Sequence, residues 1–160
     1  MKLQKNEIKN LLLIDEPYLF VDAVDVVAGK SANGVRFFPK EEWFFKCHFL
    51  TDPVVPGVFQ LEHIMQTAVI ALLIQKIPEA GIIYGKAFKD IVFHSFVRPG
   101  EILHSETEIR CFKRGLGEAE GYAWVERNGK KIITSTAKFQ MISPTLINKF
   151  VPKGVNNVKS

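Results

Sequence analysis

The sequence predicts an α+β domain in which an antiparallel sheet curls around one long apolar helix. A single long stretch, Val58 to Ile77, is apolar around most of its circumference and contains neither glycine nor proline. Two β-rich segments precede this stretch and about four follow it. An order of two strands, one helix and about four strands fits a curled antiparallel sheet better than it fits alternating βαβ units.

The N-terminal part is expected to supply the first two strands and the segment that leads to the helix. Met1 to Asn10 is polar and helix-prone. Then come a strand over Tyr18 to Ala28, a partner strand over Ser31 to Phe38 and a short turn or helix over Lys40 to Phe45. Pro53 and Pro56 exclude regular structure between them, because proline lacks the N–H donor and favours an extended residue before it.

The C-terminal part is expected to supply the remaining strands. Pro78 stops the helix. The strand-like segments that follow are Ala87 to Val97, Glu101 to Lys113, Glu118 to Arg127 and Lys130 to Ile142. Asn128-Gly129 lies between the last two, and this dipeptide is the strongest short signal for a β-hairpin.

Composition limits both the architecture and the function. The chain has 160 residues, 47% of them hydrophobic, so we expect one domain over 1–143 and a C-terminal tail over 144–160. The net charge of +4 falls short of a nucleic-acid-binding signature, and no segment reaches the roughly 20 apolar residues of a membrane span. Cys47 and Cys111 have no metal or disulfide spacing, which favours a reducing cytoplasm and no metal.

Glu62 is the first candidate for chemistry. Its neighbours on the helix surface are Val58, Phe59, Met65, Gln66, Val69 and Leu73, of which only Gln66 is polar. An apolar setting disfavours the ionised carboxylate and raises its pKa, so that the group can act as a general acid. The alternative is a solvated glutamate that complements the helix dipole, and the helix pattern leaves both interpretations open.

His48 and Gly57 are the other candidates near the start of the helix. His48 lies in an aromatic stretch and could serve as a base near neutral pH, although a core histidine with a satisfied hydrogen bond is the simpler interpretation of one residue. Gly57 lets a ligand approach the backbone, and the free first N–H groups of a helix can hold a carbonyl oxygen. A glycine required only for the turn is the alternative.

Together these residues form a specific pattern. His48-Phe49, then Pro53, then Pro56-Gly57-Val58 and then Glu62 resemble the H-F-x-x-x-P-x-x-P-G-V-x-x-x-E motif of the hotdog-fold β-hydroxyacyl-acyl carrier protein dehydratases. Two further segments are similar to that family, namely Pro17-Tyr18-Leu19-Phe20-Val21-Asp22 and Val97-Arg98-Pro99-Gly100-Glu101. The resemblance runs from about residue 15 to about residue 142.

The resemblance implies a dimer, or a trimer of dimers, in which His48 of one subunit and Glu62 of the other serve one substrate tunnel. His48 would take the α-proton of a β-hydroxyacyl thioester, and Glu62 would protonate the departing hydroxyl. Gly57 would bind the thioester oxygen and Gln66 would hold the carboxyl. The implied substrate-binding residues are Gly57, Val58, Gln66 and Phe49.

The resemblance also implies a pathway and a partner. No metal or organic cofactor is required, and the partner is the acyl carrier protein that carries the substrate. The pathway is fatty acid biosynthesis or a specialised polyene or polyketide lipid pathway. A hotdog thioesterase and a non-catalytic hotdog partner subunit are the alternative functions. Six basic residues are candidates for a rim that attracts an acidic carrier, namely Lys86, Lys89, Arg98, Arg110, Lys113 and Arg114.

Overall fold

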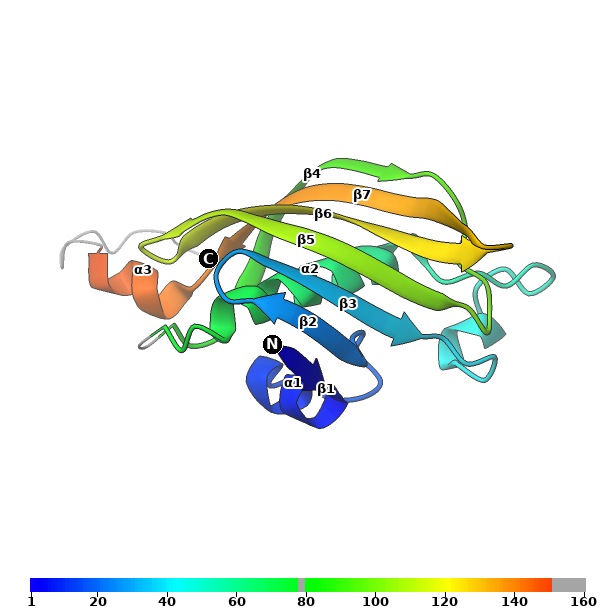
Figure 1. Cartoon of the computed structure of the whole chain (residues 1–160), viewed down its shortest axis with the longest axis horizontal. Coiled ribbons are helices and arrows are strands. Elements are labelled where there is room, and N and C mark those ends of the chain that lie inside the picture. Colours follow the sequence, from blue (N-terminus) through cyan, green and yellow to red (C-terminus); the bar gives the residue numbers. More distant parts are fainter. Residues whose placement is uncertain (78–79, 151–160) are drawn as a thin grey trace.

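The computed structural model describes residues 1–77 and 80–150 of the chain. Within these residues, one seven-stranded antiparallel sheet has the order β1-β2-β3-β5-β6-β7-β4. The strands are β1 (Lys2–Gln4), β2 (Ala23–Val27), β3 (Ser31–Phe37), β4 (Tyr84–Phe93), β5 (Ile102–Lys113), β6 (Leu116–Arg127) and β7 (Lys130–Ile142). The sheet curls over helix α2 (Gly57–Leu73), so the predicted fold class is confirmed (Figure 1).

Small residues on the inner face of the sheet let α2 approach closely. A Cβ atom on Gly34 of β3 would lie 2.3 Å from Oγ1 of Thr67 on the helix, so no larger residue fits there without displacing the helix. Thr67 also bonds Ser105 of β5 at 3.0 Å. The helix is therefore held against the sheet by close packing and by buried, mutually satisfied hydroxyl groups.

The hairpin between β6 and β7 is confirmed at Asn128-Gly129. Both residues have positive φ, 53° for Asn128 and 70° for Gly129. A two-residue type I′ turn requires positive φ at both central positions, which asparagine and glycine adopt more easily than other residues. The paired ends of the strands, Arg127 and Lys130, face each other across this turn.

The N-terminal segment differs in part from the prediction. Residues Lys2–Gln4 form β1 on the edge of the sheet, and helix α1 (Lys5–Leu12) follows. A strand of three residues is too short to give an alternating pattern, so the sequence showed only the helix. The strand predicted from Tyr18 begins instead at Ala23, because the backbone of Tyr18 and Phe20 is hydrogen-bonded to side chains of α2.

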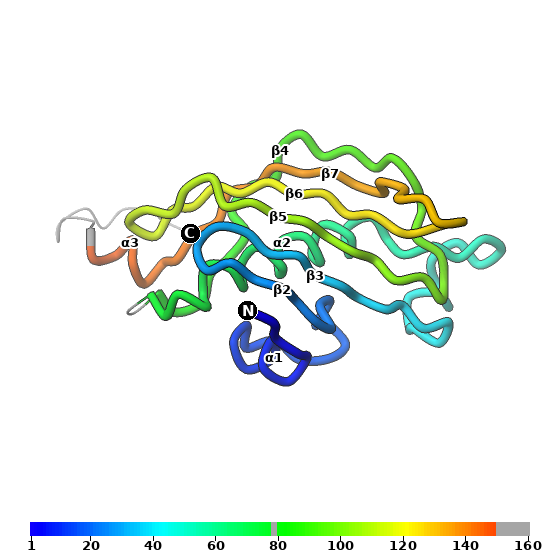
Figure 2. The backbone as a smooth tube through the Cα atoms, in the orientation of Figure 1, coloured from blue at the N-terminus to red at the C-terminus, as the bar shows by residue number. Residues whose placement is uncertain are grey.

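The two ends of the sheet carry different connections (Figure 2). The long loop after β3 contains the 3₁₀-helix η1 (Trp43–Lys46) and leads into α2 at one end. At the other end α2 finishes at Leu73, four residues before the predicted Ile77, and Pro78 lies outside the described residues. The expected tail begins as helix α3 (Pro144–Phe150), and residues 151–160 lie outside the described part of the chain.

Candidate active site

The loop that enters α2 fixes the orientation of the His48 ring. Nδ1 of His48 lies 3.0 Å from the carbonyl oxygen of Val54. A carbonyl oxygen only accepts, so Nδ1 carries the proton of the neutral ring and Nε2 keeps its lone pair. The backbone N–H of His48 donates to Phe44 in η1 at 2.9 Å, which fixes the main chain as well. The ring is thereby held as a base.

An aromatic cluster anchors η1 to the helix. Phe44 contacts Phe59 of α2 with ring centroids 5.1 Å apart and Phe38 at 5.9 Å. Trp43 contacts the same Phe59 at 5.9 Å. Such contacts bury large apolar areas in defined geometry, so the segment that carries His48 has a fixed position relative to the start of α2.

A cavity of about 380 Å³ opens beside His48. Its lining includes Phe49, Gly57 and Val58, three of the residues that the resemblance implies for substrate binding. The Gly57 N–H, at the first position of α2, donates to no group within the described residues. A Cβ atom at Gly57 would lie 2.7 Å from the Phe93 ring, so a larger residue fits there only if that ring moves. A free amide donor therefore borders the same cavity as the imidazole.

Glu62 lies one and a half turns further along α2, in a second and more apolar cavity of about 350 Å³. Leucines and isoleucines of residues 11–14, with Met65, Val69 and Leu73, line most of its wall. Burial raises the pKa of Glu62 above its ordinary value of 4.5, and the hydrogen bond from Gln66 opposes part of that rise. The carboxyl group is therefore biased toward its protonated, proton-donating form.

Gln66 fixes this carboxyl and the segment that covers it. Its Nε2 donates to Oε1 of Glu62 and to the carbonyl oxygen of Tyr18, both at 2.9 Å, and its Oε1 accepts from the N–H of Phe20 at 2.9 Å. His63 adds a fourth bond, from Nδ1 to the carbonyl oxygen of Phe20 at 2.6 Å. Gln66 therefore has the expected role for Glu62 and also holds a wall of its cavity.

His63 is not an acid–base candidate. The side chain is fully buried, and burial lowers its pKa to about 4. The ring is consequently neutral near pH 7 and donates from Nδ1 to the backbone of Phe20. Its position next to Glu62 in sequence has no catalytic meaning, because the two side chains point in different directions from the helix.

Within one chain, the structure does not bring the two candidate catalytic groups into one cavity. His48, Phe49, Gly57 and Val58 line one cavity, Glu62 and Gln66 line the other, and no residue lines both. Sequence reasoning did not find the Val54 carbonyl that orients His48, because a backbone acceptor leaves no signal in residue type. It also did not find that Asp52, four residues after His48, pairs with Arg98.

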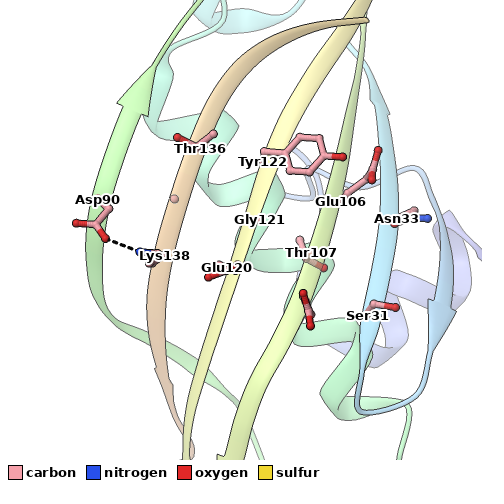
Figure 3. Close-up of a pocket in the computed structure, with 12 residues that line it drawn as sticks. Ser31, Asn33, Asp90, Glu106, Thr107, Glu120, Gly121, Tyr122, Thr136 and Lys138 are labelled. Atoms are coloured by element: carbon pink, nitrogen blue, oxygen red, sulfur yellow. Dashed lines mark hydrogen bonds and ion pairs between the residues drawn. The ribbon is translucent and has the colours of Figure 1, made fainter.

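A further cavity, of about 540 Å³, lies elsewhere, on the face of the sheet away from α2 (Figure 3). Its carboxylates already have cationic partners. Glu106 bonds Lys131 at 2.6 Å, Asp90 bonds Lys138 at 2.9 Å, and Glu120 pairs with Arg110. None of the residues predicted to act on a substrate borders this cavity, and its charges are neutralised within the sheet.

Among residues 1–77 and 80–150, no group of three or more histidine, cysteine or acidic side chains is placed to hold a metal ion. In the same part of the chain, no helix has both the length and the apolar character needed to cross a membrane.

Comparison with known proteins identifies relatives over most of the chain. Residues 11–136 match the model of the FabA-like domain. A 3-hydroxyacyl-[acyl-carrier-protein] dehydratase FabZ from Acetivibrio thermocellus is 34% identical over 139 residues, covering 85% of this chain and 92% of the relative. FabZ from Bacillus subtilis strain 168 is 32% identical over 125 residues, covering 78% of this chain and 89% of that protein.

Solved structures support the fold. The dehydratase heterocomplex ApeI:P from Xenorhabdus doucetiae superposes with a TM-score of 0.69 at 14% identity, covering 89% of this chain and 96% of that one. The PaaI protein of E. coli gives a TM-score of 0.59 at 10% identity, covering 86% and 88%. At these identities the likeness shows the hotdog fold alone. The relatives found by sequence show the family. This chain belongs to the FabA-like domain family and to its FabZ-type 3-hydroxyacyl-[acyl-carrier-protein] dehydratases.

Proposed function

We propose that the protein dehydrates β-hydroxyacyl thioesters carried on acyl carrier protein to trans-2-enoyl thioesters, in fatty acid or related lipid biosynthesis. The observation that carries this proposal is Glu62, a carboxyl group in an apolar cavity with a raised pKa and a hydrogen bond that orients it. Such a group can donate a proton to a departing hydroxyl. His48, with Nδ1 bonded to a carbonyl, is the matching base.

The reaction follows from these two groups. Nε2 of His48 takes the α-proton, and the electrons of that C–H bond form the double bond between Cα and Cβ. The Cβ–O bond breaks with its electron pair, and Glu62 supplies the proton that turns the leaving hydroxide into water. The Gly57 N–H stabilises the charge that develops on the thioester oxygen. Proton transfer from the imidazolium to the carboxylate, directly or through water, restores both groups.

The cavity beside Glu62 suits the acyl chain. It follows α2 from Glu62 to Leu73, a rise of about 16 Å at 1.5 Å per residue, and it is mostly apolar. A hydrocarbon chain there gains favourable burial in proportion to its area. The wall formed by residues 11–14 then limits the length of chain that fits, so we place the tail of the substrate in this cavity.

The two cavities require a second subunit, and the edge strand β4 is suited to provide the contact. Tyr84, at the start of β4, lines the Glu62 cavity, and Phe93, at its end, lines the His48 cavity. When a second copy adds its own β4 in the antiparallel direction, the start of one strand lies beside the end of the other. The His48 cavity of each subunit then adjoins the Glu62 cavity of its partner.

Exposure along β4 supports this dimer. The strand pairs with β7 on one side and occupies the edge of the sheet. Apolar side chains on and after it are unusually exposed, including Ile91 at 39%, Val92 at 46% and Phe96 at 61%. An exposed apolar edge strand favours pairing with another chain, and a second copy would cover it.

A mixed dimer tests whether the site is shared. We expect His48→Ala and Glu62→Gln subunits to be inactive alone, whereas a co-expressed, doubly tagged heterodimer regains activity at one of its two sites. In that heterodimer the His48 of one subunit and the Glu62 of the other are both intact. Enoyl product is measured after tandem affinity purification. Failure of the heterodimer to exceed either parent would place both groups in one subunit and refute the arrangement.

The carrier protein is expected to dock at the mouth of the His48 cavity. Arg98 lies there, with its guanidinium 5.6 Å from the ring centroid of Phe96, a residue that lines the cavity. The net charge of +4 attracts an acidic carrier over a longer range. We also place the protein in the cytoplasm, where its exposed free cysteines, Cys47 and Cys111, stay reduced.

Direct assay distinguishes the candidate activities. The purified protein is incubated with a series of β-hydroxyacyl-carrier thioesters of increasing chain length, and product is followed by mass spectrometry. We expect loss of water with the thioester intact. Release of free thiol would identify a thioesterase, and no turnover of any substrate would indicate a non-catalytic subunit.

A further inference from the structure

Gln60 is a buried polar residue that the mechanism above does not use. It lies in the first turn of α2, is 2% exposed, and lines the same cavity as His48 and Gly57. Its Oε1 is completely covered and has no hydrogen-bond partner. No side-chain hydrogen bond of Gln60 occurs within residues 1–77 and 80–150, although buried amides are normally paired. The unpaired amide therefore needs a partner from outside the described chain.

The donor end of this amide borders the cavity. Oε1 is covered, whereas Nε2 makes no bond and is not among the completely covered atoms, so Nε2 is the end that faces open space. Residues three apart are neighbours on a helix surface, which places Gln60 beside Gly57. Two unused N–H donors, one from the backbone and one from a side chain, thus lie together next to the imidazole.

We propose that the Gln60 amide is a second donor to the thioester carbonyl oxygen of the substrate, acting together with the Gly57 N–H. The inference rests on the proposed dehydration and names a further catalytic residue for it. As His48 removes the α-proton, negative charge develops on this oxygen, and two preorganised donors stabilise it better than one. An amide left unpaired in the empty protein has no protein bond to break when substrate arrives.

The test replaces the amide with a side chain of similar shape. We expect Gln60→Met to lower kcat about 100-fold, the effect of losing one donor to a developing oxyanion. The thermal midpoint and the oligomeric mass should not fall, because no protein hydrogen bond is lost. Gln66→Met is the matched contrast and should lower the thermal midpoint, since Gln66 makes three hydrogen bonds. Gln140→Met, in β7, should change neither quantity.

Ligand binding tests whether Gln60 contacts the carbonyl oxygen of the substrate and not another part of it. Affinities are measured for an unreactive pantetheine amide analogue of the substrate and for the matching amine without the carbonyl oxygen. The wild-type protein should prefer the carbonyl compound, and Gln60→Met should lose most of that preference. A Gln60→Met variant with wild-type kcat and an unchanged preference for the carbonyl compound would overturn the inference. A variant that loses its dimer but keeps a normal kcat would also overturn it, because that result would assign the amide to a contact with the partner subunit.

The same experiment distinguishes a failure of the Gln60 role from a failure of the proposed dehydration. An active wild-type protein with an unaffected Gln60→Met variant would refute the role of Gln60 and leave the dehydratase proposal standing. A wild-type protein that forms no enoyl product from any thioester would refute the dehydratase proposal, and the role of Gln60 with it.

Discussion

Replacing His48 by alanine is expected to lower kcat for dehydration about 100- to 10,000-fold, the range that general-base catalysis contributes. The variant removes the group that accepts the α-proton, and no other imidazole can take its place. His94 also lines the cavity, but its Nε2 lies 3.2 Å from Oγ1 of Thr136. Initial rates of enoyl formation measure the effect.

The matched control is His104→Ala. His104 stacks on Trp124 with ring centroids 4.1 Å apart, on the face of the sheet away from α2, and should tolerate replacement without loss of activity. A His48→Ala enzyme that turns over at a near-normal rate would remove the base from the mechanism. Because His48 has one side-chain hydrogen bond, to Val54, we expect the variant to keep its fold and its oligomeric mass.

Replacing Glu62 by glutamine is expected to cause a loss of kcat of similar size, again about 100- to 10,000-fold. Glutamine keeps the size of the side chain and can still bond Gln66, but it has no acidic proton for the leaving hydroxyl. Circular dichroism and size-exclusion chromatography should show an unchanged protein. Glu118→Gln is the control, since Glu118 bonds Gln140 on an exposed surface and lines neither cavity. Full turnover by Glu62→Gln would contradict the assignment of the acid.

The same variant has a predicted pH dependence of stability. The pKa of Glu62 is higher in the folded protein than its ordinary value of 4.5. Between these two values the folded state binds more protons than the unfolded state, so stability falls as pH rises. Glutamine does not titrate. Relative to wild type, Glu62→Gln should therefore gain stability as pH rises through this window and keep the gain above it. Urea unfolding from pH 4 to pH 8 measures the difference, and a constant difference would contradict the raised pKa.

The sequence predicted the fold well where local chemistry determines structure. The long apolar stretch could only be a covered helix, and Asn128-Gly129 adopts the two positive φ angles that a tight hairpin requires. The sequence-based prediction was wrong where tertiary contacts override the local preference for secondary structure. Tyr18 and Phe20 were predicted to lie in a strand. Their backbone groups are hydrogen-bonded to the side chains of Gln66 and His63 in α2 instead of to another strand.

The site was predictable to a similar extent. The spacing from His48 to Glu62, with Pro56-Gly57 between them, pointed to the two groups that we propose as base and acid, because each residue type suits one chemical role. The apolar surroundings of Glu62 also followed from helical periodicity. Two features of the site were not found because residue type gives no signal for them, namely the contact of the Val54 carbonyl with His48 and the unpaired amide of Gln60 beside the same cavity.

The order of residues by itself therefore determined the fold class and the family, and it supplied the two residues that we propose as the acid and the base. Tertiary structure decided which residues line the separate cavities of His48 and Glu62 in one chain, and that β4 runs from one cavity to the other. The physical reason is that residue type sets what a group can donate or accept, whereas the packing of the helix against the curled sheet sets which cavity it faces.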